Sequence, residues 1–171
     1  AVGVVVFVGL VGTDGPIPFG TAWALGPSLF ATNSHISRPV KTFLKNGGDV
    51  FISINKTKKR LRVIEAVSHP RYKERKRNYE GKKGFSLSYD VGLLKIEGKT
   101  SNYFPLADIN ELKKVDSGYR IAFLGFPTEG YEETGGSNIN LNSPLATMQS
   151  GIITTVSDYW LGDGGFENNL L

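Results

Sequence analysis

Short apolar segments alternate with turn-forming residues along the whole of this chain, and that pattern limits the folds open to it. The segments are rich in valine, isoleucine and aromatic residues, whereas Gly, Pro, Asn and Asp gather between them. Runs of this length and composition are typical of β-strands. The predicted strands are 2–11, 20–26, 29–32, 50–54, 62–67, 91–96, 120–125 and 146–156.

Helical periodicity is weak throughout, and only 108–115 is predicted to form a helical turn or two. The apolar segment 2–11 is too short to cross a bilayer and has no basic segment before it, so it is predicted to be a buried first strand. We therefore expect an all-β protein with no membrane span. Strands at this spacing favour a barrel or a sandwich.

A polar stretch in the middle of the chain predicts a boundary between two lobes. We expect a first barrel lobe at 1–98, a linker at 99–114 and a second lobe at 115–171. The first lobe has enough predicted strands to close a small barrel, whereas the second has too few. An incomplete barrel exposes strand edges and an apolar face. We therefore expect a further segment of the same polypeptide, or a companion chain, to complete the second lobe, unless it is not a barrel.

The absence of cysteine removes several kinds of chemistry. The chain has no cysteine and only two histidines, so disulfides, a thiolate nucleophile and Cys-built zinc sites are excluded. Scattered carboxylates such as Glu132 and Glu133 have no recognisable metal-ligand spacing. The sequence therefore predicts no metal and no cofactor.

The basic residues are concentrated in two places, 56–62 and 71–83, within a modest net charge of +4. Such clusters can bind nucleic acid, but only Tyr72, Tyr79 and Phe85 offer stacking surface near the second one. Solvated loops are often charged in the same way. We therefore predict loops, and no nucleic-acid partner.

Two ionisable residues stand at the edges of predicted strands, and their surroundings resemble a known family. The segment 19–35, which ends in Thr32-Asn33-Ser34-His35, resembles the hairpin that carries the general base of trypsin-like serine peptidases, and is especially similar to the HtrA-like branch. The segment 90–96, which starts with Asp90, is similar to the one that carries their triad aspartate.

Further matches to this family follow in the same order along the chain. The segment 67–72 resembles the His-Pro-x-Tyr turn that precedes the aspartate, so His69 is interpreted as a turn residue and not as a second base. The segments 118–127 and 147–153 resemble the first two strands of the second barrel. Taken together, the matches cover nearly the whole chain.

The resemblance implies a chymotrypsin-like double β-barrel, its first barrel complete and its second partial, with protein or peptide substrates. A serine hydroxyl is a weak nucleophile at neutral pH, so an imidazole must take its proton during attack. In this family His35 would be that general base, and Asp90 would fix its tautomer. The family's members are often periplasmic or secreted, which the residues alone do not show.

The nucleophile is the missing part of this pattern. Ser150 lies in a strand-like context, and Ser137 and Ser143 lie in a polar loop, so none resembles the Gly-rich serine turn of the family. The glycine-rich segment 162–165 contains no serine. In the family that serine lies further along, and much of the oxyanion hole accompanies it. The chain alone is therefore predicted to be inactive.

Two small departures from the family pattern lie beside the predicted site. Ser34 stands where alanine usually precedes the base, and Gly92 stands where alanine usually follows the aspartate. The Ser34 hydroxyl must find a hydrogen-bonding partner if it is buried. The insertion at 73–88 is also longer and more basic than the family pattern implies.

A second hypothesis accounts for the same residues without catalysis. A relative that has lost the serine turn would keep the barrel as a protein-binding or scaffold module. This hypothesis rests on the missing nucleophile, and tight binding of a partner without hydrolysis would support it. We rank it second, because the loss would also remove strands that the second lobe needs.

Overall fold

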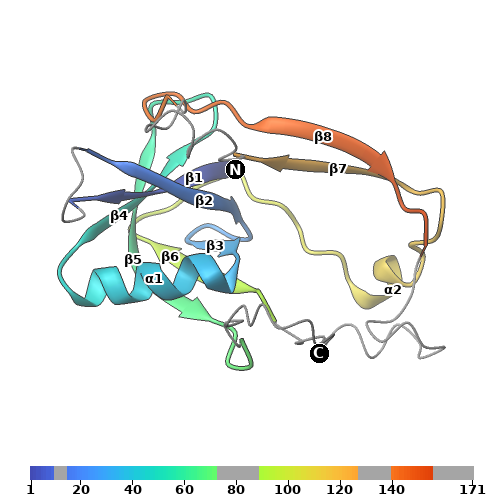
Figure 1. Cartoon of the computed structure of the whole chain (residues 1–171). Coiled ribbons are helices and arrows are strands. Elements are labelled where there is room, and N and C mark those ends of the chain that lie inside the picture. The colour runs from blue at the N-terminus through green and yellow to red at the C-terminus, as the bar shows by residue number, and fades with distance from the viewer. Residues whose placement is uncertain (10–14, 73–88, 127–139, 156–171) are drawn as a thin grey trace, which may run out of the picture. The chain divides into compact units, whose positions relative to one another are not determined.

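The computed structural model describes residues 1–9, 15–72, 89–126 and 140–155 (Figure 1). The chain divides into two compact units, each treated by itself below. The first consists of Ala1–Phe104 with Gly125–Thr147, and the second of Pro105–Leu124 with Met148–Leu171. The lobe boundaries expected at residues 98 and 115 stay a prediction.

The first unit is a closed barrel of six strands, which confirms the expected all-β barrel architecture. Its strands follow one another around the barrel in the order β1-β2-β3-β6-β5-β4, and each strand is antiparallel to both of its neighbours. The strands are β1 (Val2–Val8), β2 (Ile17–Ala24), β3 (Leu29–Thr32), β4 (Asp49–Ile54), β5 (Arg60–Ser68) and β6 (Gly92–Ile96).

Strand β1 is an almost continuous apolar run because both of its faces are covered. Val5 and Phe7 belong to the core inside the barrel. Val4 and Val6 face the other way and pack with Phe126 in a second cluster. Residues of a strand alternate between its two faces, so a strand buried on both sides must be apolar at every position.

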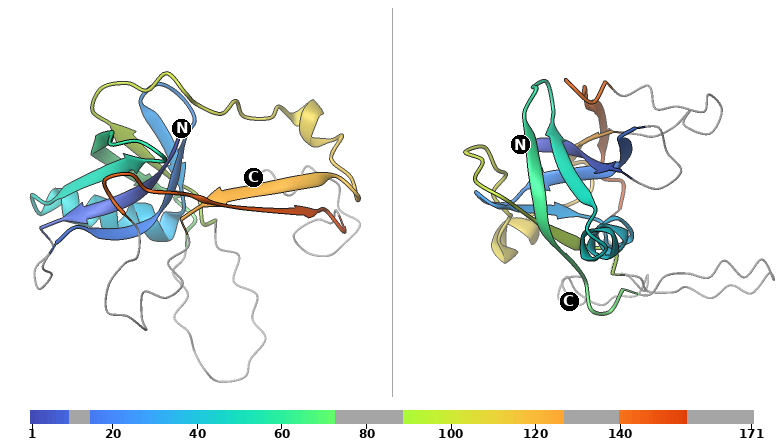
Figure 2. Two further views of the ribbon diagram at one scale, coloured as in Figure 1. Left: turned by 90° about the horizontal axis from the view of Figure 1, so that it is seen from above. Right: turned by 90° about the vertical axis from the view of Figure 1, so that its left-hand side faces the viewer.

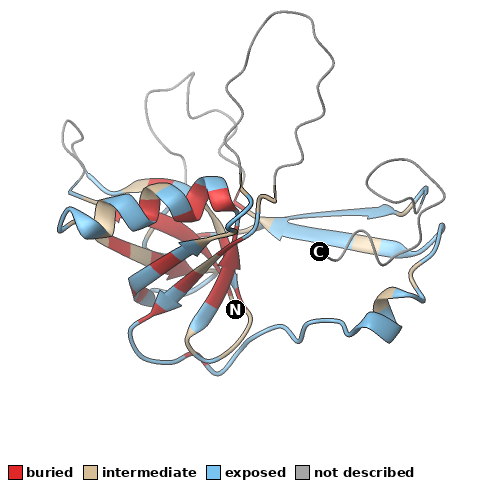
Figure 3. Ribbon diagram, turned by 90° about the horizontal axis from the view of Figure 1, so that it is seen from below, coloured by how far each residue is buried: buried red, intermediate tan, exposed pale blue. Residues whose placement is uncertain are grey.

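A twelve-residue helix, α1 (Ser34–Lys45), contradicts the expectation that helical structure is confined to 108–115. It lies against β4, β5 and β6. Its buried Ile36 and Val40 join the core inside the barrel. Figure 2 shows the helix from two further sides, and Figure 3 shows buried residues on one of its faces.

Helix α1 was not predicted, because it contains Pro39 and several residues with low helix propensity. Proline has no N–H to donate to the carbonyl four residues earlier, here that of His35. A helical signal is nevertheless present. Ile36, Val40 and Leu44 recur at a spacing of four, which places them on one face of a helix.

The second unit contains the short helix α2 (Ile109–Leu112) and most of a two-stranded sheet, formed by β7 (Arg120–Gly125) and β8 (Thr147–Ile152). The helix lies within the predicted segment 108–115, and Asp108 and Glu111 form a capping box at its start. Phe123 and Met148 are exposed on this sheet. The further segment or companion chain that was expected to complete this lobe, and so to cover these side chains, stays a prediction. None of the helices in the described residues is long and apolar enough to span a membrane.

Candidate active site

The barrel topology brings the two predicted site residues together. Strand β3 pairs with β6 in a register that sets Thr32 opposite Gly92. His35 lies three residues beyond Thr32, and Asp90 lies two residues before Gly92. Because the strands are antiparallel, the chain leaves β3 and enters β6 at the same end of the barrel. The two residues, 55 positions apart in the sequence, therefore become neighbours.

His35 and Asp90 are joined by two hydrogen bonds. The Asp90 Oδ2 atom lies 2.6 Å from His35 Nδ1, and Oδ1 accepts from the backbone N–H of His35 at 2.9 Å. An ionised carboxylate can only accept, so the Nδ1 atom carries the proton in this pair. The Nε2 atom of a neutral His35 ring then bears the lone pair. The ring is in the tautomer that a general base at Nε2 requires.

Asp90 also completes the start of α1. The residue before the helix, Asn33, makes no side-chain cap to it. The carboxylate of Asp90 accepts from the N–H of His35 in the first turn instead, where backbone N–H groups have no partner within the helix. The Asn33 side-chain amide donates to the backbone carbonyl of Asp90 at 3.2 Å and lies 3.4 Å from Oδ2.

The surroundings of Asp90 favour its charged form. Partial burial would raise the pKa of this carboxyl, but hydrogen bonds from the backbone and ring of His35, its charge and the backbone N–H of Ser34 together outweigh that effect. The pKa of Asp90 is therefore lowered from its ordinary value. Asp90 stays a carboxylate at the pH where an imidazole titrates.

Gly92 is required by a close approach of α1 to β6. A Cβ atom on this residue would lie 2.2 Å from the Ser37 hydroxyl oxygen and 2.9 Å from the backbone oxygen of Asn33. Contacts under 3.0 Å are not tolerated without movement. The departure from alanine seen in the sequence therefore has a steric reason in this chain.

His69 lies in a turn after β5, as expected from the sequence. Its carbonyl accepts from the N–H of Tyr72 at 2.9 Å, and its Nδ1 accepts from the N–H of Arg71 at 3.2 Å. Its ring stacks on Tyr89 with 4.6 Å between centroids. Tyr89 directly precedes Asp90, so this stack supports the segment that carries the carboxylate.

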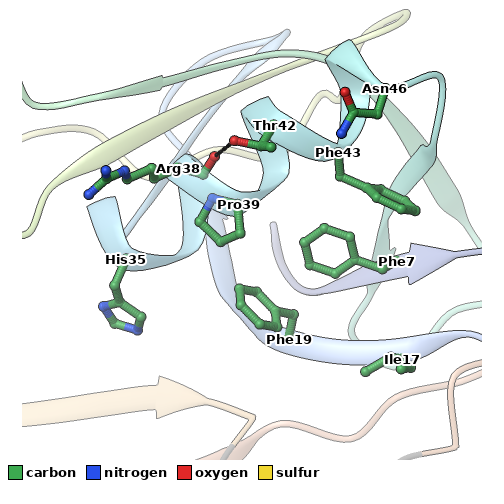
Figure 4. Close-up of a pocket in the computed structure, with 9 residues that line it drawn as sticks. All are labelled: Phe7, Ile17, Phe19, His35, Arg38, Pro39, Thr42, Phe43 and Asn46. Atoms are coloured by element: carbon green, nitrogen blue, oxygen red, sulfur yellow. Dashed lines mark hydrogen bonds between the residues drawn. The ribbon is translucent and has the colours of Figure 1, made fainter. Parts of the chain in front are cut away.

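An apolar groove of about 680 Å³ begins beside His35, between α1 and the β1–β2 strands (Figure 4). Phe7 contacts Phe19 and Phe43 edge to face, with centroids 4.8 and 5.1 Å apart. Together with His35 and Pro39, these rings line the groove. The groove was not predicted from the sequence, because one of its walls is helix α1, which was itself not predicted.

The candidate serines are placed as follows. Ser150 is an exposed residue of β8, and Ser143 lies in a turn at the edge of the described segment 140–155. Ser137 and the segment 162–165 lie outside the described residues. The basic insertion at 73–88 also lies outside them. Within the described residues, no cluster of three or more histidine, aspartate or glutamate side chains could hold a metal ion.

A scan against protein-family models finds no match to this chain, and no curated protein matches it.

Proposed function

We propose that this chain is the base-bearing part of a serine endopeptidase with a chymotrypsin-like double β-barrel. In this proposal His35 is the general base, Asp90 orients it, and the serine comes from a segment outside the given residues. The observation that carries the proposal is the double hydrogen bond between Asp90 and His35. The closed six-stranded barrel supports the proposal as well, because a chymotrypsin-like fold would carry the base and the aspartate on its first barrel.

The mechanism assigns one role to each group. As the serine oxygen attacks the peptide carbonyl, its proton passes to Nε2 of His35, and the carboxylate of Asp90 stabilises the imidazolium. The tetrahedral intermediate collapses as Nε2 returns this proton to the leaving amine. Water then attacks the acyl-enzyme, with the same nitrogen as base, and restores the serine. The chain alone lacks the nucleophile and is expected to be inactive.

The lowered pKa of Asp90 supports this assignment. An ionised carboxylate at Oδ2 holds the Nδ1 proton in place and leaves Nε2 directed away from Asp90. His35 keeps about half of its side chain exposed, so a substrate could reach it.

The test uses the full-length natural polypeptide that contains these residues, treated with a fluorophosphonate probe and measured by intact mass. We expect one probe to attach, and His35→Ala to prevent the attachment. His69→Phe is the matched control, because it removes the other histidine but keeps an aromatic ring against Tyr89. A polypeptide that takes up no probe and cleaves no protein substrate would end the peptidase proposal.

The groove favours a second candidate, a noncatalytic module that binds protein segments. One of its walls is α1, whose Arg38 lines the groove beside the apolar rings, and α1 contains no acidic residue. Apolar pockets with a few charged groups at the edge are typical of ligand sites. Binding of an apolar, acidic peptide by the chain, combined with an inactive full-length natural polypeptide, would favour this candidate over the first.

A further inference from the structure

Ser34 is completely buried directly beside the exposed His35. It is the first residue of α1, and its hydroxyl points away from the helix toward two other segments. One of these segments carries Asp90 and the other is the turn after β5. A buried hydroxyl without partners costs free energy, so the contacts of Ser34 decide what this residue does.

The Ser34 hydroxyl has a partner in each of the two segments. It donates to the backbone carbonyl of Val91 at 2.5 Å and accepts from the backbone N–H of His69 at 3.1 Å. That N–H also donates to the carbonyl of Val91 at 2.9 Å. The three groups form a closed triangle in which the hydroxyl joins α1 to the other two segments.

The position of this triangle connects it to the candidate site. Ser34 is the chain neighbour of His35, and Val91 is the chain neighbour of Asp90. The bond between them therefore fixes the backbone one residue away from each member of the pair. The bond between the side chains of His35 and Asp90 is itself partly exposed, so water competes for both groups. It stays short only if the two backbones are held at the right separation.

We propose that the Ser34 hydroxyl is a positioning group that holds His35 and Asp90 in hydrogen-bonding contact. This role rests on the proposed function, in which the pair is catalytic, but the contact itself can be measured without catalysis. Ser34 does not touch the reacting atoms in this account. It acts through the backbone, by preventing the Asp90 segment from moving away from the start of α1.

The neighbouring Ser37 offers a matched comparison. It is also completely buried, and it lies one turn further along the same helix. Its hydroxyl bonds to the Ser68 hydroxyl at 2.8 Å and lies 3.4 Å from the carbonyl of Ser34. Neither of these partners belongs to the Asp90 segment. Ser37→Ala therefore removes an equally buried hydroxyl from the same helix without cutting the link between Ser34 and Val91.

The experiment measures the His35 Nδ1 proton by NMR in the chain itself, in the wild type, Ser34→Ala and Ser37→Ala. A proton held between Nδ1 and a carboxylate resonates far downfield and exchanges slowly with water. We expect Ser34→Ala to broaden or abolish this resonance, and Ser37→Ala to preserve it. This difference should hold even if both variants unfold at a lower denaturant concentration than the wild type. If Ser34→Ala fails to fold, Ser34→Cys replaces it, with a weaker donor of similar size.

In the full-length natural polypeptide, we expect Ser34→Ala to lower kcat by about tenfold with little change in KM, since a small misplacement of a catalytic pair acts on the chemical step. An unchanged resonance in Ser34→Ala, or in Ser34→Cys where that variant replaces it, would overturn the positioning role, as would an equal loss in Ser37→Ala. A lost resonance in a protein whose full-length form is inactive would keep this role and remove the peptidase proposal instead.

Discussion

The carboxylate of Asp90 binds His35 twice, at the ring Nδ1 and at the backbone N–H, with distances of 2.6 and 2.9 Å. The same carboxylate thus orients the imidazole and completes the start of the helix that carries it. This double contact makes the position of the ring depend on one residue from a distant part of the chain. The first two predictions follow from it.

Replacing Asp90 with Asn should remove the orienting charge while keeping the size of the side chain. The amide can donate to Nδ1, which would move the ring proton to Nε2 and leave no base there. If the peptidase proposal holds, we expect kcat of the full-length natural polypeptide to fall by about 10⁴-fold, the scale of this change in a Ser-His-Asp triad. Steady-state hydrolysis of a protein substrate measures it, and a fall of less than threefold would contradict the orienting role.

The stability of the chain should depend on the charge of Asp90 at acid pH. The pKa of Asp90 is lowered in the folded state from its ordinary value of 3.8, so the unfolded state binds the proton more tightly. The stabilisation is complete above the ordinary value and is lost as pH falls through the lowered one. Urea unfolding between pH 6 and pH 2 should show a smaller acid-dependent loss in Asp90→Asn than in the wild type. Identical pH profiles would refute this prediction.

Gly92→Ala should destabilise the barrel, although alanine is the residue that the family pattern favours there. The new Cβ would meet the Ser37 hydroxyl and the backbone of Asn33. We expect a loss of about 1 to 3 kcal/mol in the free energy of unfolding, the usual cost of overpacking. The loss caused by Gly92→Ala should be smaller when it is measured in a Ser37→Gly background, because that background lacks the closer contact. No loss in the single variant would show that α1 moves away freely.

Two buried serines should respond in opposite ways to loss of the hydroxyl. In the described part of the chain, the Ser53 hydroxyl is buried without a hydrogen-bonding partner, whereas the Ser34 hydroxyl has two. We expect Ser53→Ala to leave the free energy of unfolding unchanged or raise it by about 1 kcal/mol, and Ser34→Ala to lower it by about 1 to 3 kcal/mol. Urea midpoints measure both, and the reverse order would contradict the assigned contacts.

The strands were predictable because the β-propensity of their residues and the turn residues between them can be read from short stretches of sequence. Valine-rich and aromatic runs between turn residues indicated each of the strands that the described part of the chain contains, including the buried β1. Helix α1 was missed because Pro39 and its serines and threonine lower helix propensity, although Ile36 and Val40 show helical spacing. In this region the packing of the helix against the barrel outweighs local preference.

The candidate site was predictable only as two separate residues. His35 and Asp90 each stood out by resemblance to a family pattern, but their contact depends on the pairing of β3 with β6. The partners of Ser34 depend on the same closure, so its hydroxyl appeared only as a departure that needed an explanation. The groove beside His35 depends on the position of α1 and was not predictable from the strands.

The peptidase proposal is tested most directly by the rate at which the full-length natural polypeptide hydrolyses a protein substrate, with and without His35→Ala. Ser53→Ala serves as the control, since it removes a buried hydroxyl that has no hydrogen bond to His35 or Asp90. We expect measurable hydrolysis in the wild type and the control, and a loss of several orders of magnitude in His35→Ala. An unchanged rate in His35→Ala would show that His35 is not the base.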